Sequence, residues 1–162
     1  MKTYTLFFIL HFTVGFACNC TPNKDHEKHI ESSFNYYDEI FIGEVEKNSN
    51  ETMIEVQEVF KGDLKTEKML RAGIKMDSCS YYFGEEGTAI FYGIIVDNTF
   101  YASVCSPTRM FSRPYLYPPP PPPVPDSDFD SEKRKRKMTE YLKNEKQRLE
   151  YEIDWLRKRK KN

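Results

Sequence analysis

The chain has 162 residues, of which 39% are hydrophobic, 15% aromatic and 30% charged. This length allows one compact domain with appendages and excludes two full domains, and the low hydrophobic fraction indicates that some of the chain lies outside any core. The net charge of −1 conceals an asymmetry. Residues 18–130 carry 10 Lys and Arg against 19 Asp and Glu, a net charge of −9, whereas residues 131–162 carry 13 against 6, a net charge of +7. The acidic body argues against general nucleic-acid binding.

The first segment has the features of a secretory signal. Lys2 precedes an apolar run over residues 4–16, which is shorter than the roughly 20 apolar residues that span a bilayer. Gly15 and Ala17 are small residues at the positions that signal peptidase requires. Residues 1–17 are therefore predicted to be a signal peptide, and the mature, secreted protein is expected to begin at Cys18. Alternatively, the apolar run forms a buried N-terminal helix, or the chain is cut before Cys18 by the lipoprotein pathway and Cys18 carries a lipid anchor.

Four cysteines are expected to form disulfides in an exported chain. Cys18 and Cys20 are too close in sequence to bridge each other easily, so each needs Cys79 or Cys105 as its partner, and both connectivities remain open. Either one closes two long loops and stabilises a small domain by about 4 kcal/mol per bridge in the chain-entropy model. A zinc site is the alternative, but the cysteines lack the paired C-x-x-C spacing of such sites.

Turn signals divide the body into a weak helix and a set of short strands. Residues 23–33 are predicted to form a short helix that holds His26 and His29 one turn apart. These two histidines could bind a metal, but without a third ligand they are predicted to be simply exposed. The predicted strands lie at residues 36–45, 53–60, 64–74, 88–96 and 99–104.

Details of these segments predict a small closed barrel. The first strand should be buried on both sides at its start and on one side later, and Asp97-Asn98 should form a tight turn between the last two strands. Gly43 and Gly93, which lie inside strands, should mark bulges or barrel corners. The fold class is therefore mainly β, a five-stranded barrel with a short helix. Asn50 begins an Asn-Glu-Thr sequon in a turn and is a predicted glycosylation site.

These segments together resemble the inhibitory N-terminal domain of the tissue inhibitors of metalloproteinases (TIMPs), within the netrin-like OB-fold group. The Cys18-Asn19-Cys20-Thr21-Pro22 start is similar to the family's C-x-C start with a Pro shortly after. Further similarity lies in the strand and Lys-Gly turn over 54–62, the connection around Cys79 and the hairpin over 88–105. The resemblance covers about residues 18–111, just over half of the chain.

The resemblance implies the bridges Cys18–Cys79 and Cys20–Cys105 and a mechanism of inhibition. The free α-amine and carbonyl oxygen of Cys18 would chelate, in trans, the active-site zinc of a metalloproteinase, at the ligand position that a catalytic zinc keeps open. The remaining contacts would come from Asn19 in the specificity pocket, Thr21 and Pro22 along the cleft, and Asp77 and Ser78 on the neighbouring ridge.

The chain also departs from the family. Vertebrate members have a third bridge in this domain and a second domain with three more, and the position of Asn19 usually holds Thr or Ser. The alternative function is therefore a non-inhibitory OB-fold binding module, in which the C-x-C start only staples the barrel and the partner is a protein or a polyanionic glycan. An enzyme is not expected, because no Ser-His-Asp or Cys-His constellation occurs and paired cysteines leave no thiol nucleophile. No cofactor is expected.

The rest of the chain divides into a linker and a helix. Residues 112–131 form a Pro-rich and acidic linker, in which Pro118 to Pro123 should be a polyproline II spacer or a docking motif. Residues 132–162 lack Gly and Pro and predict one basic amphipathic helix. Its apolar stripe consists of Leu142, Leu149, Ile153 and Leu156. The two basic clusters at its ends indicate binding to a polyanion or an anionic surface, or simply a solvated helix.

Overall fold

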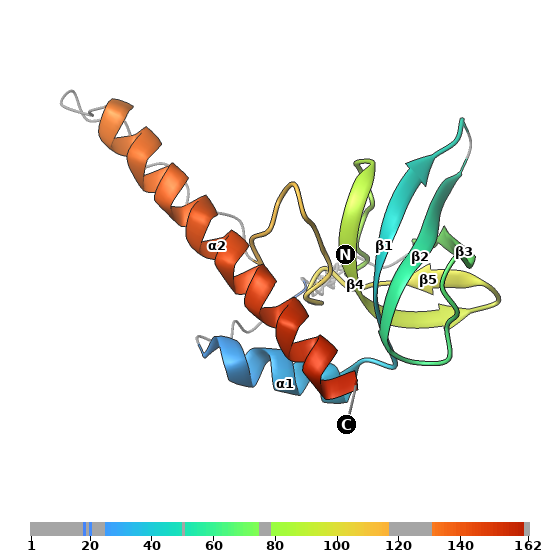
Figure 1. The fold of residues 1–162 in the computed structure, drawn as a ribbon. Helices are drawn as coiled ribbons and strands as arrows, with labels where there is room; N and C mark the ends of the chain where they lie inside the picture. The colour runs from blue at the N-terminus through green and yellow to red at the C-terminus, as the bar shows by residue number, and fades with distance from the viewer. Residues whose placement is uncertain are drawn as a thin grey trace, which may run out of the picture.

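A computed structural model describes Cys18, Cys20 and residues 25–49, 51–74, 79–116 and 131–160. In these residues two helices accompany a sheet of short strands (Figure 1). The elements in chain order are α1 (His26–Tyr36), β1 (Glu39–Lys47), β2 (Thr52–Lys61), β3 (Met69–Ala72), β4 (Gly87–Val96), β5 (Thr99–Tyr101), β6 (Arg109–Met110) and α2 (Ser131–Lys160).

Strands β1 to β5 close into a barrel. The hydrogen-bonded order is β1-β2-β3-β5-β4, and β4 pairs back onto β1, so no edge of the five strands remains open. All of these pairings are antiparallel except β3 with β5, and the short β6 adds to β4. The structure thus confirms the predicted mainly β fold class, a five-stranded barrel with one short helix and a C-terminal helix, and it is consistent with the OB-fold.

The two strand glycines lie where the barrel wall bends. The register between β1 and β2 shifts at Gly43, and a Cβ there would lie 2.6 Å from the backbone oxygen of Glu55. At Gly93 strand β4 changes partner from β1 to β5, and a Cβ would lie 2.1 Å from the backbone oxygen of Tyr101. The register shift and the change of partner confirm both predictions of a bulge or corner. Neither site has room for a side chain, which explains why both residues are glycine.

The predicted turn at Asp97-Asn98 is also present. Both residues have positive φ, 49° and 60°, which matches the twist of the β4–β5 hairpin. The third predicted strand is shorter than residues 64–74 and consists of β3 alone. Helix α1 begins at His26 after an Asp25 cap, whose carboxylate accepts a hydrogen bond from the Lys28 backbone N–H, and continues to Tyr36.

The barrel interior is an apolar core built largely from aromatic rings. Phe41 stacks on Phe91 with ring centroids 4.8 Å apart, and Phe100 meets both rings edge-on. Apart from these rings, the buried members of this inner core are Val45, Ile54, Val56, Val59, Leu70, Phe83, Ala89, Ala102 and Met110.

A second apolar cluster lies on the outer side of the same wall, as the burial predicted for β1 requires. Ile40 and Ile42 of β1 face outward and are buried beneath α2, together with side chains of β2 and β4. Helix α2 contributes the stripe residues Leu149, Ile153 and Leu156, while Phe34 of α1 and Trp155 of α2 pack edge to face. The C-terminal half of α2 is therefore part of the core and no separate appendage. The buried members of this outer cluster are Ile40, Ile42, Phe60, Ile90, Tyr92, Leu149, Ile153 and Leu156.

A charged network is buried in the outer cluster. The Arg109 guanidinium of β6 donates to both carboxylate oxygens of Glu152 on α2, with 2.8 Å for the shorter contact, and the two side chains are 4% and 1% exposed. The Tyr92 hydroxyl donates to the same carboxylate at 2.7 Å. Burial raises the pKa of Tyr92 well above its usual value, and the nearby negative charge of Glu152 raises it further. The phenol therefore stays protonated and keeps its hydrogen bond.

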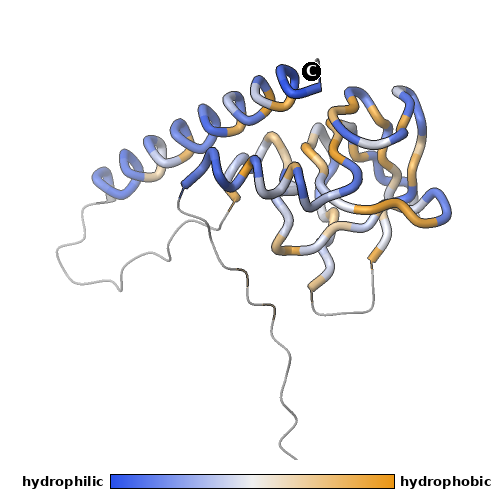
Figure 2. Tube along the Cα trace, turned by 90° about the horizontal axis from the view of Figure 1, so that it is seen from below, coloured by the Kyte–Doolittle hydropathy of each residue, from blue (hydrophilic) through white to orange (hydrophobic). Residues whose placement is uncertain are grey.

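Helix α2 has two halves in different surroundings. Residues 145–160, the docked half, lie against the barrel and α1, whereas residues 132–144, the arm, extend past both (Figures 1 and 2). All arm side chains are exposed except the half-buried Tyr141, whose ring lies 6.4 Å from that of Tyr115. Leu142 of the predicted stripe is on the arm and is 38% exposed, so the apolar stripe is longer than the surface that covers it.

The two histidines of α1 are not simply exposed, contrary to prediction. His26 lies within hydrogen-bonding distance, 3.1 Å, of the Arg148 carbonyl oxygen on α2, and its ring is 6.0 Å from that of Tyr151. His29 is half-buried, and its Nε2 is buried without a hydrogen-bond partner. The prediction was wrong because the sequence pattern did not reveal that α2 covers this face of α1.

Candidate functional site

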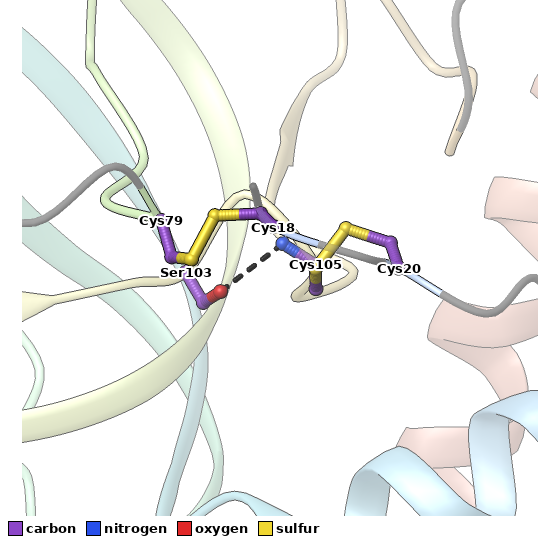
Figure 3. The surroundings of a disulfide bond; sticks show 5 residues. All are labelled: Cys18, Cys20, Cys79, Ser103 and Cys105. Carbon is purple, nitrogen blue, oxygen red and sulfur yellow. Dashed lines mark hydrogen bonds between the residues drawn. A yellow bond between two sulfur atoms is a disulfide. The ribbon is translucent and has the colours of Figure 1, made fainter. Parts of the chain in front are cut away.

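The candidate site is the pair of disulfides that fastens the segment around Cys18 and Cys20 to the barrel. Cys18 bridges Cys79 and Cys20 bridges Cys105, with Cα–Cα distances of 5.5 and 5.2 Å (Figure 3). This is the pairing that the TIMP resemblance implies. Sequence reasoning from spacing had left both connectivities open, so the tertiary structure decides between them.

The segments that hold Cys79 and Cys105 are themselves hydrogen-bonded together. The Val104 N–H donates to the Cys79 carbonyl at 2.8 Å, and the Tyr81 N–H donates to the Ala102 carbonyl at 2.9 Å. Next to this ladder, the Cys105 N–H donates to the Ser103 hydroxyl at 3.2 Å (Figure 3). Cys18 and Cys20 are therefore attached at two points of one rigid unit, and we call this unit the disulfide ridge.

Both N-terminal cysteines remain accessible on the ridge. Cys18 and Cys20 are partly exposed, and Cys105 is exposed. The remaining predicted contact residues, Asn19, Thr21, Pro22, Asp77 and Ser78, lie outside the described residues. The same holds for the predicted glycosylation site Asn50, the signal peptide and the proline run.

An open cleft of about 700 Å³ lies beside the ridge. One wall is formed by Tyr36 and Tyr37 at the end of α1, and the other by Cys79, Tyr101 and Cys105 with their neighbours. Burial raises the pKa of Tyr37 to about 12, so its hydroxyl stays protonated and able to donate a hydrogen bond at neutral pH. Tyr36 is 78% exposed, which leaves an aromatic ring available to a partner next to the disulfides.

Within the part of the chain that the structure describes, no group of three or more His, Cys, Asp or Glu side chains is arranged to hold a metal ion. No described helix is long and apolar enough to cross a bilayer. The two disulfides are compatible with a secreted protein.

Sequence reasoning missed the Arg109–Glu152–Tyr92 network and the docking of α2. Two signals pointed to them. The first signal is the start of β1, where apolar residues occur on both faces of the strand, so the outer face with Ile40 and Ile42 needs an element that covers it. Glu152 interrupts the apolar stripe between Leu149 and Ile153, and an acid at that position is well tolerated only when a cation faces it.

No protein-family model, no curated protein and no solved structure gives a significant match to this chain.

Proposed function

We propose that the chain is a secreted, TIMP-like inhibitor of zinc metalloproteinases, whose mature N-terminus at Cys18 chelates the active-site zinc of the target enzyme. The observation that carries the proposal is the double attachment of the C-x-C start. Cys18 and Cys20 are each bonded to one of two segments that are hydrogen-bonded to each other. A chelating residue held in this way loses little conformational entropy when it docks.

The chemistry needs only the backbone of Cys18. An α-amine has a pKa of about 8, so it loses its proton readily when a metal takes its lone pair. Amine and carbonyl oxygen of one residue then form a five-membered chelate at the open position of a catalytic zinc. In this proposal the chain inhibits rather than catalyses, and Asn19, Thr21, Pro22, Asp77 and Ser78 contact the enzyme as the resemblance implies.

The decisive experiment compares the mature protein with a variant that carries one extra Ala before Cys18. Mass spectrometry first establishes whether the exported protein begins with an unmodified Cys18. Both proteins keep the two disulfides, so they differ only in the position of the free amine. In titrations against a panel of zinc metalloproteinases, we expect the added Ala to weaken inhibition by about 100-fold or more, equivalent to about 2.7 kcal/mol.

Two outcomes would contradict chelation. Equal inhibition by the two proteins would show that the amine is not a ligand, and an acylated or extended N-terminus would leave no free amine to bind. Absence of inhibition by a protein with an unmodified Cys18 would instead favour the non-inhibitory OB-fold binding module. In that function the disulfides only staple the barrel, and the open cleft beside Tyr36 and Tyr37 supports it as a place for a protein partner.

A further inference from the structure

The arm of α2 combines high cationic charge with an exposed, helical position. Five consecutive cations, Lys133 to Lys137, occupy its first turns, and all five are exposed. In the described residues Lys135 pairs with Glu132 at 3.5 Å, while Lys133, Arg136 and Lys137 form no ion pair. Cations in this state are available to a partner of opposite charge.

The docked half keeps this cluster away from the acidic barrel. Leu149, Ile153 and Leu156 are buried, and the Arg109–Glu152 pair fixes the helix on the barrel wall. At about 1.5 Å per residue, residues 133–137 lie about 12–18 Å along the axis from Glu145, the first buried residue of the docked half. This is more than the Debye length of about 8 Å at physiological salt, so the acids of the barrel are largely screened from the cluster.

We propose that the arm is a binding site for a linear sulfated polysaccharide. A helix turns by about 100° per residue, so five consecutive cations point in all directions around its axis. A flat lipid surface could contact only one side of such an arrangement, whereas a flexible polyanion can follow it round.

Two further observations favour a glycan over a membrane. Among the described arm side chains, the exposed large apolar ones are Met138 and Leu142, at 39% and 38%, and these two offer little area for insertion into lipid. The two disulfides indicate an oxidising, extracellular compartment, whereas anionic lipids enrich the cytoplasmic leaflet. Sulfated chains are the polyanions that a protein would meet there.

The test measures binding of the purified full chain to heparin, used as the probe, at several salt concentrations. The arm variant carries Lys133→Gln, Arg136→Gln and Lys137→Gln. The matched control carries Lys28→Gln, Lys65→Gln and Lys68→Gln, which remove the same charge from exposed positions outside both basic clusters of α2. We expect the arm variant to bind about tenfold or more weakly than wild type, with a slope of log affinity against log salt reduced by about 2–3. The control should bind within about twofold of wild type.

Three results would overturn the proposal. The first is an equal loss of heparin affinity in the arm and control variants. The second is no heparin binding by wild type at physiological salt. The third is tighter binding to phosphatidylserine-containing vesicles than to heparin, which would assign the arm to membranes. Because the arm lies apart from the disulfide ridge, the arm variant should retain whatever inhibition wild type has. The inference therefore stands or fails independently of the inhibitor proposal.

Discussion

The two sides of the barrel wall are stabilised in different ways. The inner side is packed with apolar side chains and stacked aromatic rings, whereas the buried charged residues among those described, Arg109, Glu145 and Glu152, lie on β6 and α2. The outer side, beneath α2, combines an apolar cluster with the buried Arg109–Glu152 pair and the Tyr92 hydroxyl.

The difference follows from what each side must specify. The interior is enclosed by hydrogen-bonded strands, whose pairing already sets the register, so apolar packing is sufficient there. A helix on a sheet surface has no such pairing, and its apolar stripe could dock with several offsets. A single buried ion pair makes one offset much better than the others, because every other offset separates the buried charges of Glu152 and Arg109 from each other.

The largest effect should come from breaking the ion pair. Glu152→Gln leaves the Arg109 guanidinium buried without its counter-charge and should lower the free energy of unfolding by about 3–5 kcal/mol. Urea unfolding followed by the fluorescence of Trp155, the single tryptophan of the chain, measures this at the docked half itself. Glu150→Gln is the matched control, because Glu150 is exposed on the same helix and its loss should change stability by less than about 0.5 kcal/mol.

A triple variant separates charge pairing from packing. Replacing the network with Arg109→Met, Glu152→Leu and Tyr92→Phe removes the three polar side chains together. It should recover part of the lost stability, because the Pro107 and Pro114 carbonyls, which accept hydrogen bonds from Arg109, lose their donor. If the triple variant were as unstable as Glu152→Gln alone, the charge argument would be wrong and the side-chain shapes would be responsible.

A matched pair of leucines compares the two sides directly. Leu70 lies in the inner core and Leu156 in the outer cluster, and both are 0% exposed. Each change to Ala should lower the free energy of unfolding by about 2–4 kcal/mol. If α2 and the barrel form one cooperative unit, tryptophan fluorescence and far-UV circular dichroism will give the same midpoint in both variants. Separate transitions in Leu156→Ala would show that α2 leaves the barrel by itself.

A smaller effect is expected at the exposed edge of the interface. Arg157 donates to both carboxylate oxygens of Glu58, with 2.8 Å for its shortest contact, and the Arg157 side chain is 50% exposed. Arg157→Gln should lower stability by about 1 kcal/mol or less, and by less still at high salt, because solvent screens the pair. Lys158→Gln is the control. An effect of Arg157→Gln that salt does not change would contradict an ionic origin.

The pH dependence of α2 docking should be visible at His29. Burial lowers the pKa of His29 from its usual value of 6.5; Glu152 opposes this shift, and His26 and Arg109 reinforce it. The folded protein therefore holds this proton less tightly than the unfolded chain, so the contribution to stability is complete above the unfolded pKa and is lost as pH falls below about 6.5. Unfolding midpoints measured at neutral and mildly acidic pH should fall less in His29→Gln than in wild type. Equal falls would assign the pH dependence to other groups.

The sequence predicted the barrel well because its signals are local. Alternating apolar residues and turn residues located the strands, Gly43 and Gly93 marked the bulge and the corner, and β1 was correctly expected to be buried on both sides at its start. At the candidate site, the presence of disulfides followed from composition, and their pairing followed only from the TIMP resemblance. The spacing of Cys18 and Cys20 from their partners does not by itself distinguish the two connectivities.

What the sequence alone determined is therefore the set of strands, the amphipathic helix and the division of charge between an acidic body and a basic end. Only the tertiary structure decided that half of α2 belongs to the core, that His26 contacts α2 while His29 is half-buried, and that Arg109 pairs with Glu152. Hydrophobic periodicity states that a face must be covered, but it carries no information about which distant segment covers it. That choice depends on the match of shape and charge between surfaces far apart in the chain.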